Sequence, residues 1–437
     1  MRAEPASRGR GGFEALDACV LCGFCLQACP TFLATGDEAD GPRGRIALMR
    51  ALEQGELAPD DPALITHLDR CLGCRGCEPV CPSGVGYGRG LEAARATLAR
   101  IAGVAAAARA ALWVLTTPGV SHVAYAAARA LRATGLPGAL AGWGTFRFAL
   151  GMLAATKPES RGRPRTADDG PRAFAPAVPG RPGPSSAVLL FRGCVMNGLF
   201  SHVHDATIRT LAVNGYAVRD VAGQGCCGAL HAHAGLLDDA QALARANVAA
   251  FGEGPDDTAP IAVNSAGCGA MLKDYGHLLG DPGGERLATR VRDVTELLSA
   301  RGPVAGAPLT ATVAYDPPCH LLHAQGIADA PLQVLGAVPG LRFVSTPDAS
   351  LCCGSAGLYT LAQPTLSRAV LRPKLDSLRA AGATVVASGN PGCLMQLGAG
   401  LRAAGIPAAV RHPVELLDGS YRKAGWYETN RGRAKAV

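Results

Sequence analysis

The sequence has few aromatic residues, few lysines and no long uninterrupted hydrophobic run. Of its 437 residues, 5% are aromatic and 18% are charged. The longest uncharged stretch, 380–401, and the stretch 110–128 are both broken by turn-forming residues, so neither supplies the roughly 20 apolar residues that a membrane-spanning helix needs. No apolar run typical of an export signal occurs in residues 1–30. We therefore expect a cytoplasmic chain without a transmembrane segment.

Basic charge is present but scattered. The formal net charge is +7, with 37 Arg and 5 Lys, and the basic residues do not alternate with aromatic residues in a stripe. This distribution does not favour nucleic-acid binding. The basic tail, residues 421–437, is expected to be solvated, with contact to an anionic membrane surface as the alternative. Apolar residues make up 48% of the chain, which excludes a disordered protein.

Cysteine is the one abundant reactive residue. There are 16, and all lie in two zones, residues 19–81 and 194–393. In a reducing compartment, cysteines bind metals or carry out redox chemistry more often than they form structural disulfides. The function is therefore expected to depend on these two zones.

The second zone is a duplication. Its three cysteine elements recur at offsets of 125, 126 and 125 residues, each after a short apolar run, which indicates two repeated α/β units with mainly parallel sheets. We expect an α+β multidomain chain that begins with an α-helical two-cluster ferredoxin domain (1–90). A helical segment (91–156) and a Pro-rich mobile linker (157–186) follow. The two α/β cysteine-rich repeats (187–305 and 306–420) come next, and the basic tail (421–437) ends the chain.

The first zone contains the bacterial ferredoxin spacing C-x2-C-x2-C-x3-C-P twice. In proteins with two such runs, the fourth cysteine of each run binds the cluster of the other run. Two [4Fe-4S] clusters are therefore expected, with crossed ligands. Cluster one takes Cys19, Cys22, Cys25 and Cys81, and cluster two takes Cys71, Cys74, Cys77 and Cys29. Structural zinc is the alternative, although two complete runs ending in proline argue against it.

Each repeat of the second zone has a vicinal Cys-Cys-Gly sequence and two single cysteines. The eight cysteines are Cys194, Cys226, Cys227, Cys268, Cys319, Cys352, Cys353 and Cys393. Neighbouring side chains can serve one site only if the backbone turns sharply, and Gly228 and Gly354 permit that turn. The pattern resembles the cysteine-rich CCG domain of heterodisulfide reductase subunits. That domain has a further cysteine where this chain has Ser265 and Asn390, so one or two further iron-sulfur centres, zinc and free thiols all stay open.

Other residues near the second zone are weaker candidates. His231, His233, His320 and His323 could hydrogen-bond to thiolates, and His320, next to Cys319, is the best candidate, with ordinary packing as the alternative. Residues 223–228 match G-x-G-x-x-G, but cysteines occupy the turn and no acidic residue follows in a βαβ context. We expect no flavin or NAD on this chain, and no catalytic residue is assigned.

Taken together, residues 19–30, 36–46, 67–85, 265–270 and 351–357 resemble the iron-sulfur subunit of bacterial glycolate oxidase. The resemblance implies an oxidoreductase subunit. In such a complex, flavoprotein partners oxidise glycolate to glyoxylate, and the iron-sulfur subunit passes the electrons to a respiratory acceptor, expected to be quinone, with peripheral contact at the cytoplasmic face of the inner membrane. Two alternatives are the iron-sulfur subunit of anaerobic glycerol-3-phosphate dehydrogenase and a heterodisulfide-reductase-like thiol/disulfide redox protein.

Overall fold

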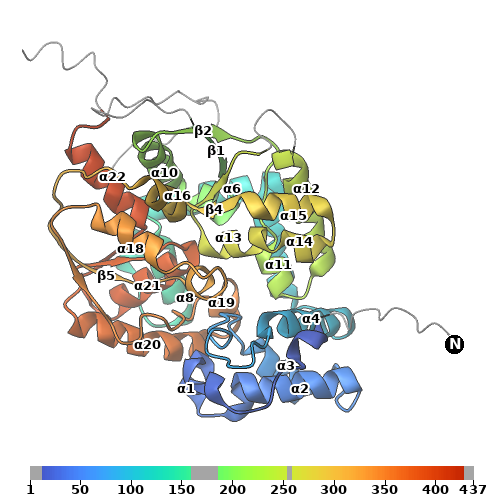
Figure 1. The fold of residues 1–437 in the computed structure, drawn as a ribbon. Coiled ribbons are helices and arrows are strands. Elements are labelled where there is room, and N and C mark those ends of the chain that lie inside the picture. Colours follow the sequence, from blue (N-terminus) through green and yellow to red (C-terminus); the bar gives the residue numbers. More distant parts are fainter. Residues whose placement is uncertain (1–11, 159–185, 253–257, 428–437) are drawn as a thin grey trace, which may run out of the picture.

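The computed structural model describes residues 12–158, 186–252 and 258–427 (Figure 1). Residues 12–101 form an N-terminal domain of short helices and contain no strand. Its elements are η1 (Phe13–Leu16), η2 (Phe24–Ala28), α1 (Pro30–Thr35), η3 (Glu38–Asp40), α2 (Pro42–Gln54), α3 (Pro62–Asp69) and α4 (Tyr87–Ile101). The expected α-helical ferredoxin domain is thus confirmed, but the expected boundary at residue 90 falls inside α4. Leu91 and Leu98 of α4 pack in the core of this domain.

A helical segment follows, as expected from the Ala- and Leu-rich sequence. It consists of α5 (Ala106–Thr116), α6 (Pro118–Ala133), α7 (Leu136–Ala139) and α8 (Thr145–Ala155). Helix α8 packs on the second repeat, where Phe148 enters the core with Leu397 and Leu401. By contrast, α6 has no buried residue. No single helix in the described ranges is long and apolar enough to cross a membrane, although α4 and α5 pass that test as a pair bent by 109°.

Each repeat is a four-stranded parallel sheet with helices on its faces, as predicted. The first repeat has β1 (Ser186–Phe191), β2 (Tyr216–Asp220), β3 (Ile261–Val263) and β4 (Val291–Asp293), in the order β2-β1-β3-β4. The second has β5 (Ala311–Tyr315), β6 (Leu341–Val344), β7 (Val385–Ala387) and β8 (Ala409–Arg411), in the order β6-β5-β7-β8. The central strands are short, and β3 and the last four residues of β1 are buried, which is typical of parallel sheets covered on both sides.

The helices of the first repeat lie between and after its strands. They are α9 (Val195–Leu199), α10 (Ser201–Val213), α11 (Ala229–His233), α12 (Leu237–Gly252), α13 (Ala266–Lys273), α14 (Tyr275–Leu279), α15 (Pro282–Arg290) and α16 (Val294–Arg301). Those of the second repeat are α17 (Cys319–Leu322), α18 (Asp329–Gly336), α19 (Tyr359–Ala362), α20 (Pro364–Ala380), α21 (Pro391–Ala403) and α22 (Pro413–Lys423). The helices expected over 238–248 and 366–380 correspond to α12 and α20.

The two repeats share one hydrophobic core. Val188 and Leu298 of the first repeat pack with Leu394 and Leu417 of the second. Arg209 of α10 also forms a two-pronged ion pair with Asp418 of α22, with both N–O distances 2.8 Å. The repeats are therefore one structural body rather than two independent domains.

The expected boundary and solvation of the tail are wrong for its described part. Helix α22 continues through residue 420, and Tyr421 is fully buried, within hydrogen-bonding distance of Asn214. Trp426 and Tyr427 pack against the shared core. The aromatic side chains hold this part of the tail against the protein although basic residues lie beside them, because burying the apolar area of an aromatic ring is more favourable than leaving it in water. The Pro-rich linker lies outside the described residues, except at its ends.

Candidate metal centres

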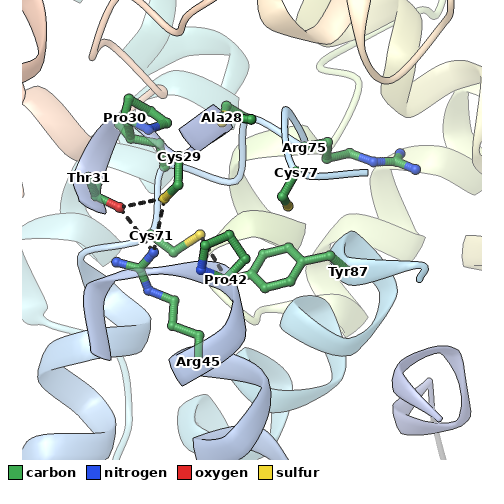
Figure 2. Close-up of a pocket in the computed structure, with 12 residues that line it drawn as sticks. Ala28, Cys29, Pro30, Thr31, Pro42, Arg45, Cys71, Arg75, Cys77 and Tyr87 are labelled. Atoms are coloured by element: carbon green, nitrogen blue, oxygen red, sulfur yellow. Dashed lines mark hydrogen bonds between the residues drawn. The ribbon is translucent and has the colours of Figure 1, made fainter. Parts of the chain in front are cut away.

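Two cavities in the N-terminal domain are lined by cysteine side chains. The first contains Cys29, Cys71, Cys74 and Cys77 and is closed on one side by Arg45 and Tyr87 (Figure 2). The second contains Cys19, Cys22, Cys25 and Cys81, with Cys77 at its edge. Each cavity encloses about 300 to 420 Å³, including its open mouth. The last cysteine of each sequence motif therefore lies with the first three cysteines of the other motif.

The two cysteine loops have the same unusual backbone. In both, the residues on either side of the second cysteine are left-handed: Leu21 and Gly23 around Cys22, at φ 56° and 84°, and Gly73 and Arg75 around Cys74, at φ 61° and 59°. Left-handed backbone is costly for Leu and Arg, and such strain persists where the surrounding structure enforces it, commonly at functional sites. The repeated conformation turns three closely spaced thiols toward one cavity.

A buried charge network supports the wall of the first cavity. Arg45 is 1% exposed, and its Nη1 donates to Thr31 Oγ1 at 3.0 Å and lies 3.9 Å from Cys29 Sγ. Asp40, also fully buried, bonds to His67 at 2.8 Å and to Arg70 at 3.0 Å and lies 3.5 Å from Arg45. The positive charge of Arg45 faces a site rich in thiols.

This environment determines which thiols ionise most easily. Burial raises the pKa of Cys71, but the charges of Arg45 and Arg95 and the hydrogen bonds with Tyr87 and Gly73 together outweigh it, so the pKa is lowered overall. Burial raises the pKa of Cys77 well above its usual value. Thiols are the ligands that iron-sulfur clusters require, and a buried thiol without a bound metal is poorly ionised. Four converging thiols beside a buried guanidinium therefore fit a cluster that carries negative charge.

The topology of the repeats gathers the other eight cysteines. In each sheet the direction of strand order changes between the two central strands, which are β1 and β3 in the first repeat and β5 and β7 in the second. Ligands of parallel sheets bind where the strand order changes direction, at the carboxyl ends of the strands. Cys194 and Cys268 follow β1 and β3, and Cys319 and Cys393 follow β5 and β7. The vicinal cysteines come after the neighbouring strands β2 and β6. All four thiols of a repeat thus reach the same edge.

The thiols of each repeat are close but not bonded. The Sγ–Sγ distances are 3.6 Å for Cys194 and Cys226, 3.9 Å for Cys319 and Cys352, and 3.4 Å for Cys353 and Cys393. A disulfide needs about 2.05 Å. Two thiolates on one tetrahedral metal, with bonds of about 2.3 Å, lie roughly 3.8 Å apart. These pairs therefore fit ligation of a shared metal atom, either iron in a cluster or zinc.

The predicted sharp turn after each vicinal pair is present. Gly228 and Gly354 have φ values of 84° and 85°. A Cβ on Gly354 would lie 2.6 Å from the Ser367 carbonyl oxygen, and one on Gly228 would lie 3.1 Å from the Ala240 oxygen. Only glycine combines this left-handed backbone with such a close approach.

The histidines differ in their relation to the cysteines. His320 Nδ1 lies 3.5 Å from Cys319 Sγ, and its ring is 5.5 Å from that of His233. Burial lowers the pKa of His233 to about 3, so this ring is neutral. His231 is buried, and His323 Nε2 lies 2.8 Å from the Ser350 carbonyl oxygen. Of the four, His320 is the one with a hydrogen-bond contact to a thiol within the described part of the chain.

The residues that replace the additional cysteines meet each other. Ser265 Oγ donates to Asn390 Oδ1 at 3.4 Å, across the interface between the repeats. The same oxygen accepts the backbone N–H of Gly267 at 3.1 Å, and Asn390 Nδ2 donates to Cys393 Sγ at 3.6 Å. Sequence reasoning identified both positions as departures from a pattern, but it did not place them together. It also missed Arg45 and Tyr87, although Arg45 lies in the 36–46 stretch that carried the resemblance.

Comparison with known proteins gives the same division of the chain. Residues 15–85 match the 4Fe-4S dicluster domain family, and residues 188–273 and 313–398 each match the cysteine-rich domain family. The fold and site thus define an iron-sulfur protein with one dicluster domain and two cysteine-rich repeats. Its 4Fe-4S clusters belong to the dicluster domain, and the cysteine pairs of the repeats are consistent with further ligation.

Relatives of similar length specify the family. The chain is 34% identical over 419 residues to the probable glycolate oxidase iron-sulfur subunit of Bacillus subtilis, covering 91% of this chain and 92% of that protein. It is 32% identical over 429 residues to the glycolate oxidase iron-sulfur subunit of Escherichia coli, covering 93% and 95%. Lactate utilization protein A of Oceanobacillus iheyensis is 31% identical over 245 residues, 54% of this chain and 98% of that protein. This chain belongs to the family of glycolate oxidase iron-sulfur subunits.

Proposed function

We propose that this chain is the electron-carrying subunit of a complex that oxidises glycolate to glyoxylate. Flavoprotein partners remove two electrons from the 2-hydroxy acid, and this chain conducts them singly to a respiratory acceptor, quinone or a carrier that feeds it. One observation carries the proposal: two cysteine-lined cavities lie side by side and share Cys77 at their boundary. Adjacent cluster sites are what electron transfer needs, whereas a purely structural metal site does not require a neighbour.

The proposed ligand sets are crossed. Cluster one takes Cys19, Cys22, Cys25 and Cys81, and cluster two takes Cys71, Cys74, Cys77 and Cys29, as the cavity linings suggest. When bound, each cluster stores one electron at a time. The residues of this chain hold the thiolates, exclude water and supply the positive charge of Arg45 beside cluster two.

The crossing is testable by serine variants of the two fourth ligands. Cys29→Ser is expected to alter the electron paramagnetic resonance (EPR) signal of the cluster held by the second motif, and Cys81→Ser that of the cluster held by the first. Cys22→Ser serves as a matched control for cluster one and Cys74→Ser for cluster two. If Cys29→Ser resembled Cys22→Ser rather than Cys74→Ser, the ligands would not be crossed.

Glycolate is the proposed substrate of the complex because the two relatives that cover nearly the whole chain bear that name. Lactate is the second candidate, supported by relatives named for lactate utilization that match about half of this chain. Deleting this subunit from its host should abolish glycolate-dependent oxygen uptake. Glycolate-dependent oxygen uptake that persists after the deletion, in a host without a related subunit, would refute the assignment. If the deletion abolished only lactate-dependent oxygen uptake, the second candidate would be favoured.

Peripheral contact with the inner membrane is also proposed, through α5 to α8. Residues 106–155, which contain these four helices, have four arginines and no acidic residue. Trp113, Val123 and Phe146 are 57%, 68% and 74% exposed. Basic residues beside exposed apolar side chains favour anionic lipid surfaces. Flotation of the chain with anionic but not neutral vesicles would support this contact. If the chain stayed in the vesicle-free fraction with both anionic and neutral vesicles, this contact would be excluded.

A further inference from the structure

The two cysteine-rich repeats have similar cysteine sites, but these sites have different neighbours. Figure 1 shows the N-terminal domain against both repeats, with α1 beside α20 of the second repeat and α4 beside α11 of the first. The contacts of the first repeat with this domain include helix α4: Arg89 pairs with Asp274, and Arg95 donates to the His233 carbonyl oxygen at 3.2 Å.

The cysteine site of the second repeat instead lies against the cluster-two loop. Leu72 and Cys74 of that loop pack in one apolar cluster with Cys319, Cys352 and Tyr359. Apolar packing between the two sites excludes water from the space that separates them.

Polar contacts fix the same junction. Tyr359 donates its hydroxyl hydrogen to the Arg70 carbonyl oxygen at 2.8 Å, immediately before the second cysteine motif. A Cβ placed on Gly76, within that motif, would lie 3.5 Å from His323 Nε2 of the second repeat. Side chains of the second repeat therefore hold the cluster-two loop in place.

The thiols of the first repeat have a different cover. The ring of Tyr125 on α6 lies over Gly198, where an added Cβ would come within 2.5 Å of it. Gly198 belongs to α9, which begins directly after Cys194, so helix α6 packs beside this cysteine of the first repeat. The described part of the N-terminal domain supplies none of the cysteines packed in the core around Cys227.

Asn390 adds a second difference between the repeats. It stands at the N-cap of α21 but does not cap its own helix. Its oxygen instead accepts from Gly267 N of α13 and from Ser265, while its N–H group donates to Cys393 Sγ. An N-cap side chain normally accepts from its own helix, so this amide is used for positioning across the interface. The thiols of the second repeat have contacts with Asn390 and His320, and hydrogen bonds to cluster sulfurs stabilise the reduced state.

We infer that the second repeat holds an iron-sulfur centre coupled to cluster two, with Cys319, Cys352, Cys353 and Cys393 as ligands and Asn390 as a positioning residue. The first repeat lies off this route. The inference rests on the proposed electron-transfer function. It adds a third redox site, and it assigns unequal roles to two repeats that the sequence makes look equivalent.

The test compares Cys353→Ser with its counterpart Cys227→Ser in the full chain, purified without oxygen. We expect Cys353→Ser to lose iron and sulfide and to change the relaxation of the reduced cluster-two EPR signal. Cys227→Ser should leave that signal unchanged. Parental iron content in Cys353→Ser, or the same change of the cluster-two signal in both variants, would overturn the inference. If the parent chain gave no cubane signals at all, the proposed function itself would fail.

A milder pair of variants tests the role of Asn390 and covers the case in which Cys353→Ser does not fold. Asn390→Asp keeps the oxygen that accepts from Gly267 but loses the N–H donor to Cys393. We expect unchanged iron content and a lower midpoint potential for the second-repeat centre, because the reduced state loses a hydrogen bond. Ser265→Ala removes a hydrogen bond to Asn390 Oδ1 but leaves the N–H donor to Cys393, so it should change that potential less than Asn390→Asp does. Equal potentials in the parent and Asn390→Asp would refute the positioning role.

Discussion

Replacing Arg45 tests how the protein sets the properties of cluster two. Arg45→Met removes a buried charge while keeping a long apolar side chain, and Arg45→Lys keeps the charge but loses the forked geometry. Arg45 donates to the His67 carbonyl oxygen at 2.7 Å and to Thr31 at 3.0 Å, and it lies 3.5 Å from buried Asp40. Breaking a buried ion pair by removing one partner costs about 3–5 kcal/mol.

The electrostatic effect can be estimated separately from the loss of stability. At an effective dielectric constant near 20, a unit charge about 8 Å from an added electron changes its energy by roughly 2 kcal/mol, or about 90 mV for one electron. The midpoint potential of Arg45→Met should therefore fall by at most about 90 mV. Arg45→Lys should retain most of the parental potential.

The assay is a redox titration followed by the EPR signal of cluster two, together with thermal unfolding of both variants. We expect both variants to unfold at lower temperature, but only Arg45→Met to show the large fall in potential. An unchanged potential in Arg45→Met, with the cluster intact, would refute the electrostatic role of Arg45. An equal fall in both variants would mean that hydrogen bonding, rather than charge, sets the potential.

Two further predictions concern stability. Burial, and after it the charge of Asp274, raise the pKa of the Glu92 carboxyl group to about 7. The folded chain therefore holds the carboxyl proton of Glu92 more tightly than the unfolded chain does. The contribution of Glu92 to stability consequently falls as the pH rises from about 4.5 to 7. We therefore expect the unfolding free energy of Glu92→Gln, relative to that of the parent, to rise by at most about 3 kcal/mol from pH 5 to pH 8, as measured by denaturant unfolding. The same difference between variant and parent at pH 5 and at pH 8 would contradict this. Gly354→Ala should lower the unfolding temperature and deplete metal in the second repeat, because its Cβ would lie 2.6 Å from the Ser367 oxygen. Gly382→Ala, at φ 63° with open space, should cost only about 1–2 kcal/mol, and equal losses in the two variants would contradict a tight turn at Gly354.

The fold could be predicted from sequence wherever a pattern is local. The strands at 187–191, 261–263, 311–315 and 385–387 follow from short apolar runs between turns, and the duplication follows from constant cysteine offsets. The strands and the duplication need no knowledge of distant contacts. The crossed cysteine sets are expected for another reason: in proteins with two such motifs, the fourth cysteine of each motif binds the cluster of the other motif.

Features that depend on distant contacts could not be predicted. The sequence places Ser265 and Asn390 125 residues apart, and only the packing of the two sheets brings them together. The burial of Tyr421 depends on the shared core, which no local pattern encodes. The unequal surroundings of the two repeats likewise arise from where the N-terminal domain docks.

Iron and sulfide analysis of the full chain, purified without oxygen and combined with EPR of the reduced protein, tests the central claim most directly. Each cubane contains four irons. We expect at least about eight irons and a similar amount of sulfide per chain, with two interacting cubane signals on reduction. Iron near zero with stoichiometric zinc would contradict an electron-carrying role.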